Sequence, residues 1–294
     1  MDNFPEQEKD QSFAPPEPSP DTFTAPVAAV PLSPPADERI PEDLRVPWDW
    51  LDVVLFLFFG LGSIVVLAQV LTFIFAGVFA LKPQQIKDAA TLNTAFAVTH
   101  QVLWSLAMLI FLWLQMALRF RAPFWHTLRF RRFQAGERTF AGTLFTFFGL
   151  GMALAVAVQL ASAFLRTPSK LPIEGMFQTR PSILMMMAAG ILVAPLAEEL
   201  MFRGFLYPVV ARKFGVAAGI AVVGSLFGLM HAPQLWGGWG QIALLMLVGM
   251  VLTYARARTG SVLASYVLHL GYNSLLLLGF FLATGGLKNL PPPR

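Results

Sequence analysis

Apolar residues fall into long blocks along this chain, and no other feature constrains its fold as strongly. Each block is about twenty residues long, the helical length that crosses a hydrocarbon layer about 30 Å thick. The blocks bring the apolar fraction to 56% and the charged fraction to 13%, whereas a soluble domain has roughly 45–50% apolar and 25% charged residues. The sequence therefore predicts an all-α polytopic membrane protein.

Seven apolar blocks predict about seven transmembrane helices. We expect them to form one transmembrane helical domain over residues 49–287. The expected spans cover approximately residues 51–81, 96–118, 140–165, 182–210, 215–231, 241–256 and 260–283.

The first 48 residues have a different composition from the rest of the chain. They are rich in proline, hold ten acidic and three basic residues, and show no apolar period. Such a segment cannot bury enough apolar surface to offset the entropy lost on ordering. We therefore expect residues 1–48 to form a disordered N-terminal tail. The segment is also unlike a secretory signal, because no basic start precedes an apolar core.

Residues 49–294 are basic, with eighteen basic and seven acidic residues. Most of the basic residues lie in short connections, and in residues 119–138 they alternate with aromatic residues. That pattern favours a segment lying on anionic lipid over a nucleic-acid site, so no nucleic-acid partner is expected. The tail and every second connection carry 13 Lys and Arg, against 7 in the others. This imbalance predicts a cytoplasmic N-terminus.

Two carboxylates and an arginine interrupt the fourth span in the stretch PLAEELMFRGF. Glu199 and Arg203 are four residues apart with the acid first, the favoured order for an ion pair within a helix. Glu198 is rotated by about 100° from Glu199, so both acids cannot share the arginine equally. We expect Arg203 to neutralise Glu199 and Glu198 to act as a general base. A buried ion-pair cluster that fixes helix packing explains Glu199 and Arg203 equally well, but not the second acid.

The last spans carry further polar groups at helical spacing. His269 and Asn273 are four residues apart and share one helix face, where their N–H groups suit an oxyanion site. Phe227 and His231 repeat the spacing on the fifth span, and the phenyl ring can shield the imidazole. We expect Glu198 and His231 to hold a water molecule. The alternative for His269 and Asn273 is ordinary hydrogen bonding between membrane helices.

Metal binding is a separate possibility. The chain has no cysteine, which excludes thiolate ligands. Two histidines and a carboxylate can hold zinc with an open position, and Glu198, His231 and His269 are the candidate ligands. The HExxH motif of many zinc proteases is missing. Zinc therefore stays an open possibility.

The three motifs together resemble the family of CAAX prenyl protease 2-like intramembrane proteases, also called the CPBP or Abi family, or type II CAAX endopeptidases. The resemblance covers about residues 180–275, the expected CPBP-like core of the transmembrane domain. The prenyl proteases of this family have eight spans, one more than expected here, and lack the acidic tail. The family pattern is EExxxR, FxxxH and HxxxN, which in this chain reads Glu198-Glu199-Leu-Met-Phe-Arg203, Phe227-Gly-Leu-Met-His231 and His269-Leu-Gly-Tyr-Asn273.

The resemblance implies an intramembrane endopeptidase. Glu198 and His231 would activate water, His269 and Asn273 would form the oxyanion site, and Glu199, Arg203 and Phe227 would support them. The expected partners are the bilayer and a membrane-associated peptide or protein substrate, which for some family members is a prenylated CAAX-type protein. The expected location is the bacterial inner membrane.

Two alternatives stay open at this stage. Intramembrane Glu, Arg and His also occur in proton- or ion-coupled transporters, although the sequence shows no two-fold repeat of broken helices. The chain could also be a non-proteolytic scaffold or immunity protein.

Overall fold

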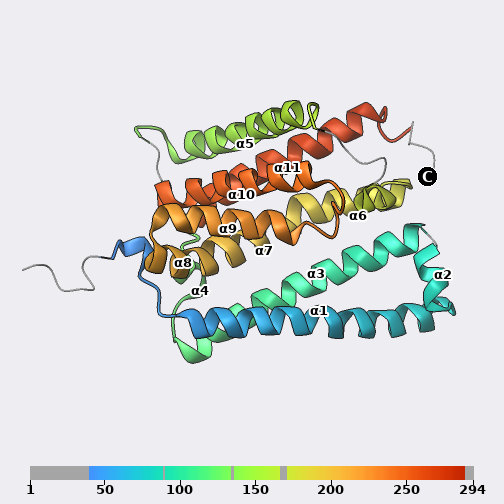
Figure 1. Cartoon of the computed structure of the whole chain (residues 1–294), viewed down its shortest axis with the longest axis horizontal. Helices are drawn as coiled ribbons and strands as arrows, with labels where there is room; N and C mark the ends of the chain where they lie inside the picture. The colour runs from blue at the N-terminus through green and yellow to red at the C-terminus, as the bar shows by residue number, and fades with distance from the viewer. Residues whose placement is uncertain (1–39, 89, 134–135, 166–170, 289–294) are drawn as a thin grey trace, which may run out of the picture. The chain divides into compact units, whose positions relative to one another are not determined.

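The computed structural model of the chain describes residues 40–88, 90–133, 136–165 and 171–288. Most of these residues are helical (Figure 1). The longer helices are α1 (Trp50–Phe79), α3 (Ala90–Leu114), α5 (Phe140–Ser162), α9 (Val216–Met230), α10 (Trp239–Thr259) and α11 (Val262–Ala283). Shorter helices are α2 (Pro83–Asp88), α4 (Phe124–Thr127), α6 (Arg180–Ala188), α7 (Ala194–Glu199) and α8 (Tyr207–Phe214). Short 3₁₀ or π segments are η1 (Glu42–Leu44), η2 (Gln115–Arg119), η3 (Pro172–Met176), η4 (Ala189–Val193) and η5 (Leu200–Leu206).

The predicted all-α membrane fold is confirmed, with a difference in the number of long spans. Six helices of the described residues are long and apolar enough to cross a membrane. The seventh expected span, at about 215–231, is the apolar helix α9, which has only 15 residues. At 1.5 Å per residue, α9 is shorter than a hydrocarbon layer is thick. The chain is an integral membrane protein, and its described residues include six helices long enough to span a membrane and one shorter apolar helix.

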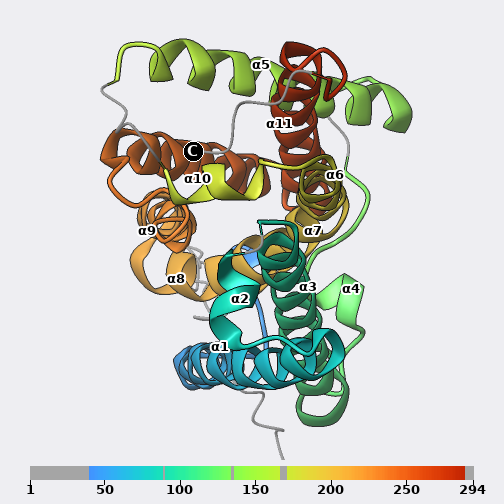
Figure 2. The same ribbon diagram turned by 90° about the vertical axis from the view of Figure 1, so that its right-hand side faces the viewer.

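The helices form two neighbouring groups that meet at α3. Helix α1 packs on α3, and the short α2 joins them. Helix α3 in turn contacts α6 and α7, which follow one another along the chain (Figures 1 and 2). Helix α11 packs against α5 on one side and contacts α7 and α10 on others, while α9 packs against α10. Helix α7, which carries the two adjacent glutamates, therefore contacts both groups, through α3 and α11.

Helices α9 and α10 approach each other closely enough to exclude a side chain at their crossing. A Cβ atom at Gly249 of α10 would overlap the carbonyl oxygen of Gly224 on α9, and a Cβ atom at Gly224 would overlap the backbone of Met250. Small residues of this kind let membrane helices pack backbone to backbone. The carbonyl of Gly249 at this crossing accepts a hydrogen bond from Arg203.

Residues 180–214 run as one helical rod that is interrupted by two π-helical segments, η4 and η5. The first interruption precedes Pro195, which has no N–H to donate into the helical ladder. In the π register the N–H of Ala194 donates to the carbonyl of Ala189, so the next carbonyl, that of Gly190, would need the missing N–H of Pro195. The Gly190 carbonyl is therefore left without a backbone donor inside the membrane domain. Segments of π-helix are frequent at functional sites.

The boundary predicted for the N-terminal tail is wrong by several residues. Residues 1–39 lie outside the described residues, but residues 40–48 of the expected disordered tail pack on the helical domain. The Trp48 side chain is fully buried, its ring stacks on Phe205 at 5.2 Å between centroids, and its Nε1 donates to the Phe205 carbonyl at 2.9 Å. Arg212 donates to the carbonyls of Val46 and Trp48. The burial of Trp48 therefore keeps residues 40–48 on the helical domain, although the residues around it are rich in acids.

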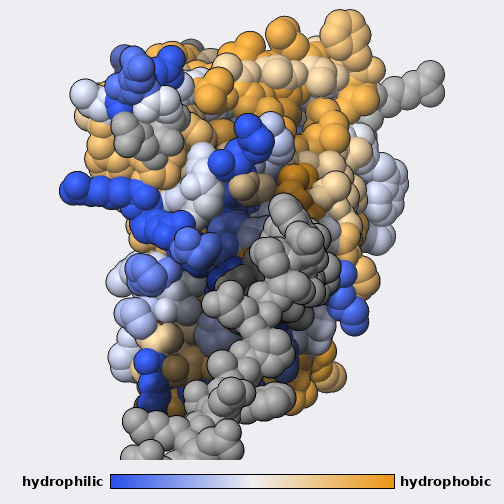
Figure 3. All heavy atoms as spheres, turned by 90° about the vertical axis from the view of Figure 1, so that its left-hand side faces the viewer, coloured by the Kyte–Doolittle hydropathy of each residue, from blue (hydrophilic) through white to orange (hydrophobic). Residues whose placement is uncertain are grey.

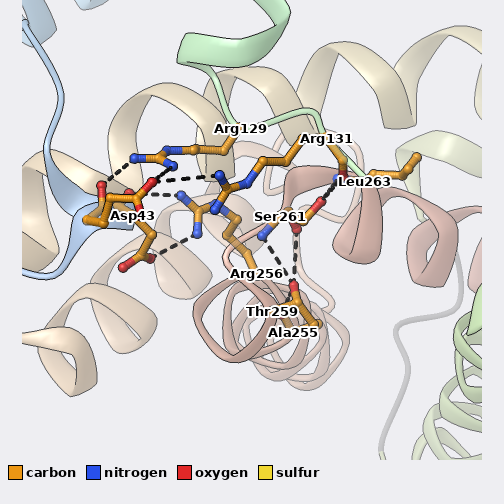
Figure 4. Close-up of polar contacts among 9 residues, drawn as sticks. Asp43, Arg129, Arg131, Ala255, Arg256, Thr259, Ser261 and Leu263 are labelled. Atoms are coloured by element: carbon orange, nitrogen blue, oxygen red, sulfur yellow. Dashed lines mark hydrogen bonds and ion pairs between the residues drawn. The ribbon is translucent and has the colours of Figure 1, made fainter. Parts of the chain in front are cut away.

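Arginines from two other parts of the chain also hold this N-terminal segment in place (Figure 4). The Arg129 guanidinium donates to the Glu42 carboxylate at 2.8 Å and also to the Glu42 carbonyl. The buried Arg256 of α10 forms an ion pair with Asp43 at 3.1 Å. Hydrophilic side chains gather on this end of the molecule, with hydrophobic ones beside them (Figure 3).

Mild acid should loosen the N-terminal segment. The hydrogen bond from Arg129 and the charge of that guanidinium hold the pKa of Glu42 below its ordinary value of 4.5. A lowered pKa in the folded state means that Glu42 stabilises the contact above pH 4.5 and that this contribution is lost as pH falls through the lower value. Hydrogen exchange of residues 40–48, corrected for intrinsic rates, should therefore show protection falling below about pH 4.5.

Glu42→Gln should remove this pH dependence, whereas Glu174→Gln, a change at an exposed acid in η3, should keep it. Equal pH dependence in the wild type and in Glu42→Gln would contradict the assignment.

Candidate active site

The ion pair predicted within the fourth span is present. The Arg203 Nη1 atom lies 2.9 Å from Glu199 Oε1, and both side chains are fully buried. The other guanidinium nitrogens are also engaged, because Nη2 donates to the Gly249 carbonyl at 2.8 Å and Nε donates to Thr253 Oγ1 at 3.2 Å. The guanidinium carbon lies 4.6 Å from the centre of the Phe227 ring. Arg203 is therefore a fixed internal cation that joins α10 to the rod of residues 180–214.

His269 lies between the two adjacent glutamates. Its Nδ1 atom is 3.0 Å from Glu199 Oε1, so the imidazole N–H donates to that carboxylate. Its Nε2 atom is 3.9 Å from Glu198 Oε2, beyond hydrogen-bond distance. Glu199 thus orients both a cation and an imidazole, whereas helical spacing predicts only its pairing with Arg203.

Glu198 differs from Glu199 in its surroundings. Its carboxylate is 7% exposed, faces a cavity and accepts no hydrogen bond from the described residues. Buried polar groups normally have partners. Glu198 therefore lies at the wall of the cavity and outside the Glu199–Arg203 ion pair, as the 100° rotation between the two acids predicted.

His231 caps the C-terminal end of α9. Its Nδ1 atom donates to the Phe227 carbonyl at 2.8 Å, which leaves Nε2 free. The Phe227 ring lies between two imidazoles, with its centre 4.9 Å from that of His231 and 5.6 Å from that of His269. The spacing FxxxH thus supplies both an acceptor that fixes the tautomer and a ring that shields the histidines from lipid.

Asn273 is the hydrogen-bond partner of the Gly190 carbonyl, which has no backbone donor. The Asn273 amide Nδ2 donates to this carbonyl at 2.8 Å, which replaces the N–H that Pro195 lacks. A side-chain amide has two N–H groups, so one remains for the cavity. Asn273 consequently ties α11 to the rod of residues 180–214 and keeps one donor for another group.

One cavity of about 880 Å³ brings the predicted site residues together. Its walls come from both groups of helices and are mostly apolar and aromatic, with methionines from several elements. The polar groups of the sequence motifs that line it are Glu198, His231, His269 and Asn273. Glu199 and Arg203 lie behind the wall and support it.

The side chains do not fit the zinc site considered above. Among the described residues, no group of three or more His, Cys, Asp or Glu side chains converges as a metal site requires. Glu198, His231 and His269 share the cavity wall without forming such a group. We therefore derive no step that involves a metal.

Sequence reasoning missed the partners of Arg203 on the sixth span and the acceptor of Asn273. Gly249 and Thr253 are four residues apart in a stretch of larger apolar residues, a pattern that marks one polar helix face. Pro195 signals a free carbonyl four or five residues earlier. Both signals are present in the sequence, although neither identifies the residue at the other end of the hydrogen bond.

These features define a membrane-embedded helical protein with a carboxylate and two imidazoles around an apolar cavity. Residues 180–275 match the family described as Type II CAAX prenyl endopeptidase Rce1-like. The match, over about a third of the chain, supports an assignment to the CPBP/CAAX protease family, whose type II CAAX endopeptidases are peptide hydrolases. The match spans α6 to most of α11, which hold every polar residue of the site. Comparison with curated proteins and with solved structures gave no match.

Proposed function

We propose that the cavity is a hydrolytic centre that cleaves peptide bonds of membrane-associated, lipid-anchored substrates. The observation that carries this proposal is the convergence of Glu198, His231, His269 and Asn273, from three helices, on one cavity. The apolar walls suit a hydrocarbon chain or an apolar peptide segment. The proposal gives each polar group one role.

Glu198 accepts a proton from a water molecule that it shares with His231 Nε2. The hydroxide attacks the carbonyl carbon of the scissile bond, and negative charge develops on the carbonyl oxygen. The intermediate then collapses as the C–N bond breaks. The proton on Glu198 passes to the leaving amine, so Glu198 returns to its starting state. The other product is a carboxylic acid, which gives its own proton to the released amine or to water and becomes a carboxylate.

His269 and Asn273 stabilise the developing charge. Because His269 Nδ1 already donates to Glu199, its Nε2 can donate to the oxyanion only in the imidazolium form, whose charge the Glu199 carboxylate stabilises. The second N–H of Asn273 is the other donor. Glu199 and Arg203 hold His269 in place and do not contact the substrate.

We place the N-terminus in the cytoplasm of a bacterial cell and the helices in its inner membrane. The N-terminal segment contacts Arg129, Arg212 and Arg256. Arginines gathered at one end of a membrane domain favour the cytoplasmic side.

The proposed function predicts cleavage without any ion gradient. Purified protein in detergent micelles should hydrolyse an internally quenched peptide that carries a farnesylated cysteine, measured as fluorescence release. The same peptide without the farnesyl group should be cleaved at least about tenfold less efficiently, since each buried methylene group contributes about 0.8 kcal/mol to binding. A transporter would instead respond to a gradient, and a scaffold would cleave neither peptide. Either result would contradict the proposal.

A further inference from the structure

Tyr272 lines the cavity and carries a hydroxyl group that takes no part in the proposed mechanism. The side chain is 5% exposed and lines the same cavity as His269 and Asn273. Its hydroxyl makes no hydrogen bond within the described part of the chain. A buried tyrosine hydroxyl usually has a partner, and phenylalanine would fill the same space without an unpaired polar group.

The position of Tyr272 on α11 places it beside the expected oxyanion donors. It follows His269 by three residues, nearly one helical turn, and directly precedes Asn273. All three residues line the cavity. Tyr266 on the same helix is different, because its ring packs near Phe130 at 5.8 Å between centroids and does not line the cavity.

We infer that the Tyr272 hydroxyl is a further donor that hydrogen-bonds the carbonyl oxygen of the scissile peptide as this oxygen becomes negative. The inference rests on the proposed hydrolytic function of the cavity and adds a residue to it. The phenol keeps its proton throughout, so no bond to Tyr272 forms or breaks. The site then has three hydrogen-bond donors on one rigid helix. They are His269 on one turn and Tyr272 and Asn273 on the next.

Three donors give the cavity a preference for the tetrahedral intermediate over the planar peptide. A donor aimed at the position of the oxyanion contributes mainly after attack has begun. Tyr272 should therefore affect kcat much more than KM. A hydroxyl that served only helix packing would affect neither constant.

Tyr272→Phe should lower kcat for the farnesylated quenched peptide by about 10²-fold, the usual cost of one oxyanion donor, with KM within about twofold of the wild type. Its thermal unfolding in micelles should match the wild type, because the ring is retained. Tyr266→Phe removes a hydroxyl from the same helix outside the cavity and should keep wild-type kcat. Wild-type kcat in Tyr272→Phe, or a change in KM alone, would overturn the inference.

A second measurement does not depend on turnover. A farnesylated peptide phosphinate, whose tetrahedral anion resembles the intermediate, should bind Tyr272→Phe about 10²-fold more weakly than the wild type by calorimetry. Equal affinity would overturn the role of Tyr272 while leaving the hydrolytic centre intact. Failure of the wild type itself to bind the phosphinate or to cleave the peptide would instead contradict the proposed function, and with it this inference.

Discussion

Glu198→Gln should abolish peptide cleavage, with kcat at least about 10³-fold below the wild type, while the protein remains folded in the membrane. Glutamine has nearly the shape of glutamate but cannot accept the proton of the attacking water. Glu198 makes no hydrogen bond to the described residues, so the substitution breaks no internal hydrogen bond. Cleavage of the quenched farnesylated peptide and thermal unfolding of the same purified sample measure the two parts of this prediction.

A matched control separates loss of chemistry from loss of charge. Glu174→Gln makes the same change at an exposed position in η3 and should retain wild-type kcat. If Glu198→Gln cleaves the peptide as well as the wild type does, Glu198 is not the general base. If it unfolds at a much lower temperature, Glu198 has a structural role that the cavity geometry does not show.

Arg203→Ala should have the largest effect on stability, a loss of about 3–5 kcal/mol in the free energy of unfolding. The substitution removes the cation from a fully buried ion pair and leaves the Glu199 carboxylate beside His269 alone. It also leaves the Gly249 carbonyl and the Thr253 hydroxyl without their arginine partner. The fraction of folded protein after heating in micelles, followed by size-exclusion chromatography, measures the loss.

The double variant Glu199→Gln with Arg203→Ala tests the physical cause. If the unpaired buried charge is the main cost, replacing Glu199 by its neutral amide should restore part of the stability lost in Arg203→Ala. Equal stability of Arg203→Ala and Glu198→Gln would contradict the division of roles between the two glutamates. A double variant less stable than Arg203→Ala would show that packing, and not charge, sets the cost.

Local spacing predicted the parts of the site that lie on a single helix. The order acid–arginine at four residues gave the Glu199–Arg203 ion pair, and the 100° step between neighbours left Glu198 free of it. Spacing of four also placed His269 and Asn273 on the face of α11 that lines the cavity. These relations follow from helix geometry alone, so they can be predicted from the sequence.

Contacts between helices could not be predicted from residue spacing in the same way. The bond from His269 to Glu199 joins residues 70 positions apart, and that from Asn273 to Gly190 joins residues 83 positions apart. Both depend on how far each helix is rotated and on the π-helical interruption before Pro195. Periodicity gives the apolar face of a membrane helix but not the neighbour that this face meets.

Composition also misplaced two boundaries. The acidic residues around Trp48 suggested that the tail extends to residue 48, yet Trp48 is fully buried against Phe205. The apolar block near 215–231 suggested a full span, yet α9 ends at Met230 after 15 residues and His231 caps it. The early end of α9 places an imidazole at the cavity.

Isotope incorporation tests most directly whether the cavity is a water-using hydrolytic centre. Purified wild-type protein, incubated in H₂¹⁸O with the farnesylated peptide, should give two products by mass spectrometry, with one ¹⁸O atom in the new carboxylate. Glu198→Gln in the same detergent should give no product above background. Absence of labelled product from the wild type, or equal labelling by the wild type and Glu198→Gln, would contradict a hydrolytic centre built on Glu198.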